Sequence, residues 1–120
     1  MAQHLVAGVG DIPDGGSLIV ELDGRSIGVF NVGGEFFAVR NRCAHQGGPV
    51  CEGKVLSALR ASVLPTGRVR EYWDDTSPVV ACPWHGWEYD LRTGALLGDP
   101  SRRIAVYETR VEDGQIHVVM

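Results

Sequence analysis

The sequence predicts an all-β, antiparallel protein that forms a single domain over residues 1–120. Asp23-Gly24 and Asp113-Gly114 each separate two short runs rich in apolar and β-branched residues, which is a strong local signal for a β-hairpin. No segment shows a sustained apolar period of 3.6 residues, so no long amphipathic helix is expected. With 120 residues, of which 44% are hydrophobic, the chain can bury one small core.

The first strands expected form a meander of three. They cover residues 17–22, 25–32 and 35–40, with turns at Asp23-Gly24 and Gly33-Gly34. Residues 41–77 lack a regular pattern, and within them residues 54–61 favour one or two helical turns. Short strands are expected again at residues 79–81, 88–90, 95–97, 103–110 and 115–120.

Composition and charge exclude several classes of function. The formal net charge is −4, from 15 acidic and 11 basic residues, so no basic groove for nucleic acid is expected. No apolar run approaches the length of a membrane span, and the first residues lack the pattern of a signal peptide. We therefore expect a cytoplasmic protein with reduced thiols that binds neither nucleic acid nor a membrane.

Two short clusters of cysteine and histidine bound the irregular stretch. The first is Cys43-Ala44-His45 and the second is Cys82-Pro83-Trp84-His85, with 36 residues between them. Thiolate and imidazole ligands favour zinc, or iron with sulfide. A structural zinc site more commonly takes paired cysteines from one element and paired histidines from another. A loop that mixes both types suits a binuclear cluster in which one iron takes the cysteines and the other takes the histidines.

With the residues that follow them, these clusters resemble the two cluster-binding loops of Rieske iron–sulfur proteins. The matching stretches are Cys43-Ala44-His45-Gln46-Gly47-Gly48-Pro49 and Cys82-Pro83-Trp84-His85-Gly86-Trp87-Glu88-Tyr89-Asp90. The continuation Leu91-Arg92-Thr93-Gly94 resembles the branch that contains ferredoxins and ring-hydroxylating oxygenases. The resemblance implies an antiparallel β-sandwich or barrel base with a small cluster-binding subdomain, at about residues 41–100, that carries both ligand loops.

The resemblance also implies one [2Fe–2S] cluster and its ligands. Cys43 and Cys82 would bind one iron, and His45 and His85 would bind the other through ring nitrogens. The residues expected around the cluster are Gln46, Gly47, Gly48, Trp84, Gly86, Trp87, Tyr89 and Pro100. The glycines among them let backbone N–H groups approach the sulfides, and Pro100 is expected in a third loop over the cluster.

Departures from the family pattern indicate the subtype. The high-potential branch carries a second cysteine in each loop, and these two form a disulfide. Gly48 and Trp84 occupy those places here, so that bridge cannot form. Trp87 stands where that branch has a serine hydroxyl beside a sulfide, whereas Tyr89 matches its tyrosine. Because one hydroxyl donor is lost, we expect a reduction potential toward the low end of the roughly −150 to +300 mV Rieske range.

The 36-residue gap is longer than expected for the smallest Rieske ferredoxins, which indicates an insertion at about residues 56–78. Thr66-Gly67 and Asp74-Asp75 predict a hairpin within it, with residues 68–72 as one arm. We interpret it as a plain surface hairpin, and a partner-docking face is the alternative. The leftover cysteine, Cys51, is interpreted as a small buried hydrophobe.

The implied function is that of an electron carrier, which passes one electron at a time from a reductase to a terminal oxygenase or related enzyme. No G-x-G-x-x-G nucleotide motif is present, and the Rieske fold itself uses the whole chain, so we expect no substrate chemistry of its own. A small Rieske subunit fixed in a larger oxidoreductase complex would use the same residues. A structural zinc protein and a cysteine hydrolase are further alternatives, although no catalytic triad is evident.

Overall fold

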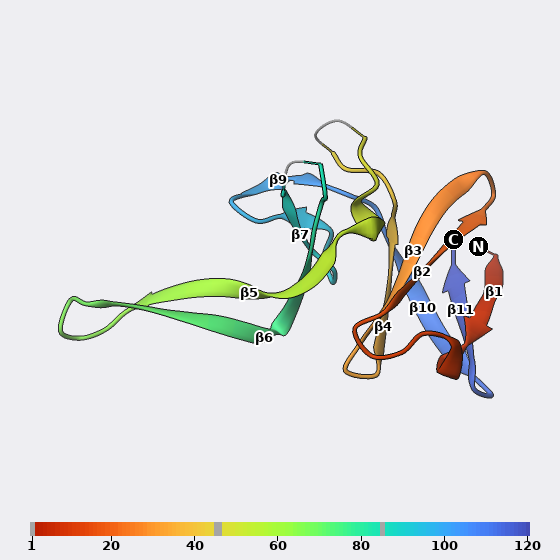
Figure 1. The fold of residues 1–120 in the computed structure, drawn as a ribbon, viewed down its shortest axis with the longest axis horizontal. Coiled ribbons are helices and arrows are strands. Elements are labelled where there is room, and N and C mark those ends of the chain that lie inside the picture. The colour runs from red at the N-terminus through yellow and green to blue at the C-terminus, as the bar shows by residue number, and fades with distance from the viewer. Residues whose placement is uncertain (1, 45–46, 85) are drawn as a thin grey trace.

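The computed structural model describes residues 2–44, 47–84 and 86–120 of the chain (Figure 1). These residues form two antiparallel sheets. The six-stranded sheet has the order β1-β11-β10-β4-β3-β2, and the five-stranded sheet has the order β5-β6-β7-β8-β9. The all-β antiparallel prediction is therefore confirmed. No helix in the described ranges is both long enough and apolar enough to cross a membrane.

The six-stranded sheet is the base of the molecule. Its strands are β1 (Gln3–Gly8), β2 (Ser17–Leu22), β3 (Arg25–Val32), β4 (Glu35–Arg40), β10 (Val106–Glu112) and β11 (Gln115–Val119). The meander β2-β3-β4 has the boundaries predicted from the sequence. Asp23 and Gly24 have positive φ angles of 52° and 75°, and Asp113 and Gly114 have 51° and 73°. Both Asp-Gly pairs therefore adopt the backbone that a two-residue hairpin turn requires.

The five-stranded sheet carries the long hairpin that projects from the body in Figure 1. Its strands are β5 (Lys54–Val63), β6 (Val69–Ala81), β7 (Glu88–Asp90), β8 (Ala95–Leu96) and β9 (Asp99–Arg103). Short 3-10 helices lie at η1 (Val9–Asp11) and η2 (Val50–Glu52). The hairpin expected from Thr66-Gly67 is present, and its turn is closed by the Leu64 N–H, which donates to the Arg68 carbonyl at 2.8 Å.

Two local predictions are wrong. Residues 54–61 form part of strand β5 rather than helical turns, because β5 pairs with β6 from Lys54↔Ala81 to Val63↔Val69. This long-range pairing overrides a weak local preference for helix. Strand β9 was not predicted, and Arg103 belongs to it rather than to β10. All residues of β9 are exposed, so it lacks the apolar alternation that marks a strand.

The buried residues form two separate clusters. The first lies within the base and comprises Ile12, Ile27, Val29, Ala38, Ile116 and Val118. The second joins the two sheets and comprises Phe30, Phe37, Val39, Cys43, Val50, Cys51, Val80, Cys82, Tyr89, Leu91, Leu96 and Ile104. Strand β3 contributes Val29 to one and Phe30 to the other, because successive strand residues point to opposite faces. Both motif cysteines therefore belong to the core between the sheets.

An exposed ion pair also joins the two sheets. Both Arg92 guanidinium nitrogens donate to the Glu35 carboxylate, at 2.5 and 2.9 Å. The same guanidinium lies 5.0 Å from the centre of the Phe37 ring. The hydrogen bond from Arg92 lowers the pKa of Glu35 below its usual value. This contact links the start of β4 to the turn after β7.

Candidate metal centre

Two loops with the same backbone hydrogen bonds carry the motif cysteines. In the first loop, residues 43–48, the Cys43 N–H donates to the Gly48 carbonyl at 2.8 Å, and the Gly47 N–H donates to the Cys43 carbonyl at 2.9 Å. The second loop, residues 82–87, repeats both bonds at the same spacing. There the Cys82 N–H donates to the Trp87 carbonyl at 2.8 Å, and the Gly86 N–H donates to the Cys82 carbonyl at 2.8 Å.

Glycine at the fifth position makes this loop geometry accessible. Gly47 and Gly86 have φ angles of 71° and 70°, in the left-handed region where other residues are strained. Each loop thus begins with a cysteine and closes at a glycine four residues later. Of the remaining predicted site residues, His45, Gln46 and His85 lie outside the described residues. Their sequence positions fall between the cysteine and the glycine of each loop.

The two cysteines are buried, with 3% of Cys43 and 1% of Cys82 exposed. Tyr89 on β7 lies beside them, fully buried, and its Oη is 3.1 Å from the Cys43 Sγ. The Ala44 N–H donates to the same hydroxyl oxygen at 3.1 Å. Because that bond uses a lone pair of the oxygen, the hydroxyl proton is available to the Cys43 sulfur. Burial, and then the hydrogen bond with Cys43, raise the pKa of Tyr89, so the hydroxyl stays a donor.

Gly48 and Trp84 bring the two loops into direct contact. A Cβ atom on Gly48 would lie only 2.8 Å from the Cδ2 atom of the Trp84 indole, so the ring packs on the bare Gly48 backbone. Gly48 is buried, whereas 55% of Trp84 is exposed. By the resemblance drawn from the sequence, a disulfide would occupy these two positions in the high-potential branch. Here the contact between Gly48 and Trp84 joins the two loops without a covalent bond.

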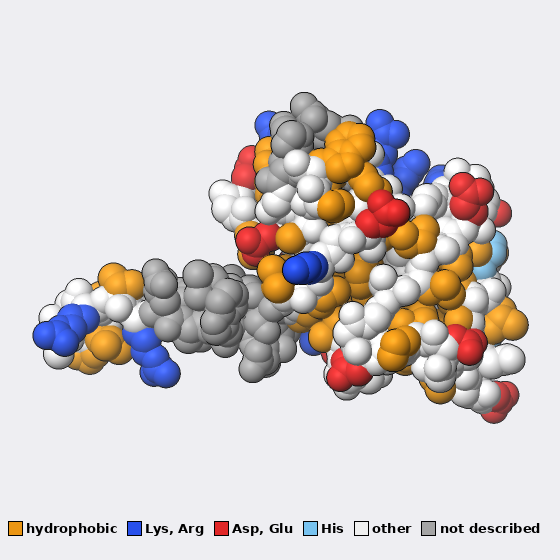
Figure 2. Space-filling model, in the orientation of Figure 1, with side chains coloured by type: hydrophobic (Ala, Val, Ile, Leu, Met, Phe, Trp, Pro, Cys, Tyr) orange, Lys and Arg blue, Asp and Glu red, His pale blue; other side chains and the backbone are white. Residues whose placement is uncertain are grey.

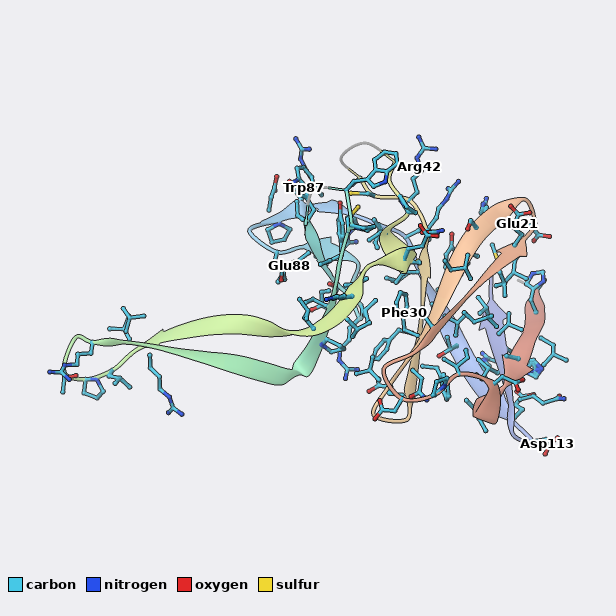
Figure 3. All side chains as sticks on the ribbon, viewed as in Figure 1. Glu21, Phe30, Arg42, Trp87, Glu88 and Asp113 are labelled. Carbon is cyan, nitrogen blue, oxygen red and sulfur yellow. The ribbon has the colours of Figure 1, made fainter. Side chains whose placement is uncertain are left out.

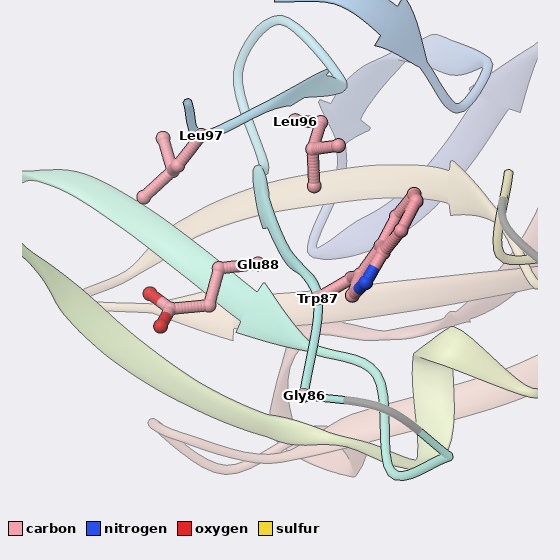
Figure 4. A pocket seen from close by; sticks show the side chains of 5 residues that line it. All are labelled: Gly86, Trp87, Glu88, Leu96 and Leu97. Carbon is pink, nitrogen blue, oxygen red and sulfur yellow. The ribbon is translucent and has the colours of Figure 1, made fainter. Parts of the chain in front are cut away.

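Trp87 is the last residue of the second loop, and Pro100 belongs to strand β9. Trp87 is half-buried, packs against the core between the sheets, and has the Arg102 guanidinium 5.6 Å from its ring centre. It lines a pocket of about 460 Å³ with Gly86, Glu88, Leu96 and Leu97 (Figure 4). Figure 4 shows Trp87 and Glu88 pointing to opposite sides of the chain. Pro100 lies in the exposed strand β9 rather than in a loop, and its role over the cluster stays a prediction.

Sequence reasoning missed one residue that supports the second loop. Gly53 follows η2, and a Cβ atom there would lie 1.7 Å from the Ala81 carbonyl oxygen. Only glycine lets this segment approach the residue that precedes Cys82. A glycine in an irregular stretch carries no signal of such a distant contact.

Cys51 packs as predicted. It is 1% exposed, and burial raises the pKa of its thiol to about 12, so the thiol is neutral. The thiol lies against Gly28 on β3, where a Cβ atom would be 2.4 Å from the Cys51 Sγ. Cys51 thus fills a space that exists because residue 28 has no side chain.

The fold and the site together define a class of protein. In this all-β, two-sheet chain, each of two matched loops begins with a buried cysteine, and the sequence places a histidine between that cysteine and the glycine that closes the loop. This order of ligand types fits a binuclear iron–sulfur protein. Residues 2–108 match the family model of the Rieske [2Fe-2S] domain. The chain belongs to the Rieske family, and its cofactor is one [2Fe–2S] cluster.

Known proteins support this assignment along the whole chain. The 3-phenylpropionate/cinnamic acid dioxygenase ferredoxin subunit of Photorhabdus laumondii is 33% identical over 121 residues, which cover 100% of this chain and 96% of that one. The ferredoxin of carbazole 1,9a-dioxygenase from Nocardioides aromaticivorans IC177 has a TM-score of 0.75 at 21% identity, covering 99% and 98% of the two chains. A chain provisionally assigned as the small subunit of an NADH-dependent nitrite reductase from Mycobacterium tuberculosis has a TM-score of 0.78 at 23% identity, covering 98% and 93%. These two structures show the fold alone.

The described residues fit a [2Fe–2S] cluster. Cys43 and Cys82 stand at equivalent positions of two loops that share one backbone geometry, and both sulfur-bearing residues are buried in one core cluster. The Tyr89 hydroxyl lies beside the Cys43 sulfur, as a donor to a thiolate ligand would. Thiolates at these positions would bind one iron.

Proposed function

We propose that this protein carries single electrons between a reductase and a terminal oxygenase of the ring-hydroxylating type. The observation that carries the proposal is the pair of matched loops with buried cysteines at their first positions and Tyr89 beside Cys43. The 33% identity to a dioxygenase ferredoxin subunit over the full chain supports a ring-hydroxylating dioxygenase as the enzyme system that this carrier would serve. The cytoplasmic setting expected from the sequence remains part of the proposal.

Four ligands hold the cluster in this proposal. Cys43 and Cys82 would bind one iron, and His45 and His85 would bind the other through ring nitrogens. Exposed residues flank the histidine positions, since Ala44, Trp84 and Gly86 are all exposed. The histidine side is therefore the route by which an electron would enter or leave.

The test uses the purified full chain reduced with dithionite. A rhombic EPR signal typical of mixed cysteine–histidine ligation is expected, together with iron and sulfide at two atoms each per chain. Cys43→Ser, Cys82→Ser, His45→Gln and His85→Gln should each abolish or alter that signal, whereas Cys51→Ala should keep it. A colourless protein that binds one zinc would refute the proposal, and so would loss of the signal in Cys51→Ala alone.

A fixed subunit of a larger oxidoreductase is the second candidate. The structural similarity to the nitrite reductase small subunit favours it, because that chain has the same fold. Native purification separates the two candidates. A carrier is expected to purify alone, whereas a fixed subunit should co-migrate with a large subunit through every step.

A further inference from the structure

Three arginines gather beside the first loop. Arg40, Arg42 and Arg103 line a pocket of about 410 Å³ whose wall also includes Cys43 and Gly47. They come from separate parts of the chain, namely the end of β4, the residue before the first loop and the end of β9. No carboxylate is among the described residues that line this pocket. We call these three residues the arginine face.

The arginine face is in contact with the loop itself. The Nε and Cζ atoms of Arg42 lie 3.6 and 3.7 Å from the place that a Cβ atom on Gly47 would occupy. The Arg42 side chain therefore packs over the glycine that closes the first loop. Figure 3 shows Arg42 at the same end of the molecule as Trp87 of the second loop, and Figure 2 shows Lys and Arg side chains around that end.

The charges of the arginine face are available to a partner. Three other exposed arginines have internal carboxylate partners, in the ion pairs Arg92–Glu35, Arg102–Asp99 and Arg110–Glu108. Arg40, Arg42 and Arg103 form no ion pair with any residue that the structure describes. Unpaired guanidinium groups are planar forks that bind carboxylates through two hydrogen bonds.

The negative net charge of the whole chain makes the arginine face able to orient an acidic partner. The formal net charge is −4, so an acidic partner is repelled by the molecule as a whole. A local positive face on a negative molecule attracts such a partner in one orientation only. Here that orientation brings the partner to the loop that holds Cys43.

We infer that the arginine face docks an acidic surface of a protein redox partner and so orients it toward the cluster. This inference rests on the proposed function as an electron carrier. Its basis is the clustering of three guanidiniums against the first loop, all without carboxylate partners in the described structure, on a chain of negative net charge.

The test measures how fast the reduced full chain is oxidised by two small probes of opposite charge. Stopped-flow rate constants are recorded with anionic ferricyanide and with cationic hexaammineruthenium(III) over a range of ionic strength. We expect the ferricyanide rate constant to rise as ionic strength falls, although the net charge of −4 alone predicts the opposite. Arg42→Gln and Arg103→Gln should each lower it roughly three- to tenfold at low salt.

The ruthenium probe and a distant variant serve as controls. A changed reduction potential would shift the rate constants for both probes in the same direction, whereas a changed local charge would shift them in opposite directions. Arg68→Gln neutralises an exposed arginine at the tip of the projecting hairpin and should leave both rate constants unchanged. Poly-L-glutamate, an acidic polypeptide, should slow ferricyanide oxidation of the parent chain but have little effect on the Arg42→Gln, Arg103→Gln double variant.

Three results would overturn the inference. The first is a ferricyanide rate constant that decreases as the ionic strength is lowered. The second is an Arg68→Gln effect equal to that of Arg42→Gln, and the third is slowing by poly-L-glutamate that is the same in the double variant. Failure of the proposed function gives a different result, because a chain without the Rieske EPR signal shows no cluster oxidation to measure.

Discussion

The hydroxyl of Tyr89 is the described polar group best placed to tune the cluster. It lies 3.1 Å from the Cys43 Sγ, it is fully buried, and its oxygen already accepts the Ala44 N–H. Reduction adds negative charge to the cluster and its sulfur ligands. A hydrogen-bond donor at a ligand sulfur therefore stabilises the reduced state more than the oxidised state, and raises the reduction potential.

Tyr89→Phe should therefore lower the reduction potential. Hydrogen bonds to charged acceptors contribute about 1.5–3 kcal/mol, and a difference of about 1–2 kcal/mol in that energy between the two oxidation states corresponds to roughly 40–90 mV for one electron. Protein-film voltammetry measures the shift. Tyr107→Phe is the matched control, because Tyr107 packs against the base cluster and should leave the potential unchanged. Equal potentials in the Tyr89→Phe variant and the parent chain would contradict this role.

Gly53 acts through close packing rather than through chemistry. A Cβ atom at this position would lie 1.7 Å from the Ala81 carbonyl oxygen and 2.7 Å from its carbon. Both are backbone atoms of a paired strand, so relieving the clash would require the backbone to shift. The φ angle of Gly53 is −76°, so the constraint comes from this contact and not from backbone strain. The contact holds the start of β5 against the residue before Cys82.

Gly53→Ala should lower the free energy of unfolding by about 2–4 kcal/mol, because the substitution overpacks a backbone contact. It should also lower the cluster content, since Cys82 directly follows Ala81. Urea unfolding followed by circular dichroism measures the first effect. Gly10→Ala is the control, because nothing lies within 4 Å of a Cβ atom there, and it should change stability by less than about 0.5 kcal/mol. Similar midpoints for the two variants would count against the steric argument.

At the scale of elements, local turn chemistry was predictable and long-range pairing was not. Asp23-Gly24 and Asp113-Gly114 determine their own turns, so both hairpins could be placed from the sequence. Strand β5 depends on β6, and β9 depends on the pairing of Ala95 with Arg103, so neither leaves a local pattern. The cysteines were found because their spacing to histidine is local. The arginine face was not, because the fold gathers its residues from separate elements.

The distal part of the β5–β6 hairpin, residues 58–77, pairs only with itself. The β-ladder register shifts between Ser57 and Ala58, and β6 joins β7 only through residues 79–81. Among the described residues of this part, Val63 and Val69 at the tip are 75% and 64% exposed. The tip of the distal hairpin is therefore exposed, and the β-ladders given for the described residues join its distal part to no other strand.

Replacing residues 58–77 with Asn-Gly should leave the body intact. Ser57 and Pro78 are Cα partners, so a two-residue turn can join them. We expect the visible absorption of the cluster to be unchanged and the free energy of unfolding to change by less than about 1 kcal/mol, since loop length has a weak effect on stability. Loss of the cluster, or a larger loss of stability, would show that the hairpin supports the fold.

At the scale of the whole molecule, the two core clusters differ in their relation to the metal centre, because only one of them contains the motif cysteines. The base cluster lies within the six-stranded sheet and contains no cysteine. The cluster between the sheets contains Cys43, Cys51 and Cys82, and it receives Phe30, Phe37 and Val39 from the base. An iron–sulfur cluster bound to both loops would cross-link only the second of these regions. Its binding energy would therefore stabilise that region directly and the base indirectly.

Removal of iron should therefore loosen one part of the molecule more than the other. We expect residues 47–53 and 86–104 to lose roughly ten- to a hundredfold of their hydrogen-exchange protection in the apo-protein, whereas strands β2, β3 and β11 keep most of theirs. Hydrogen–deuterium exchange with peptide mass spectrometry, on chelator-treated and untreated protein, measures the difference. Uniform loss over both sheets would show one cooperative unit and would refute a cluster-binding subdomain at about residues 41–100. Selective loss is expected because β2, β3 and β11 pack around the base cluster, which the iron-bound loops do not enter.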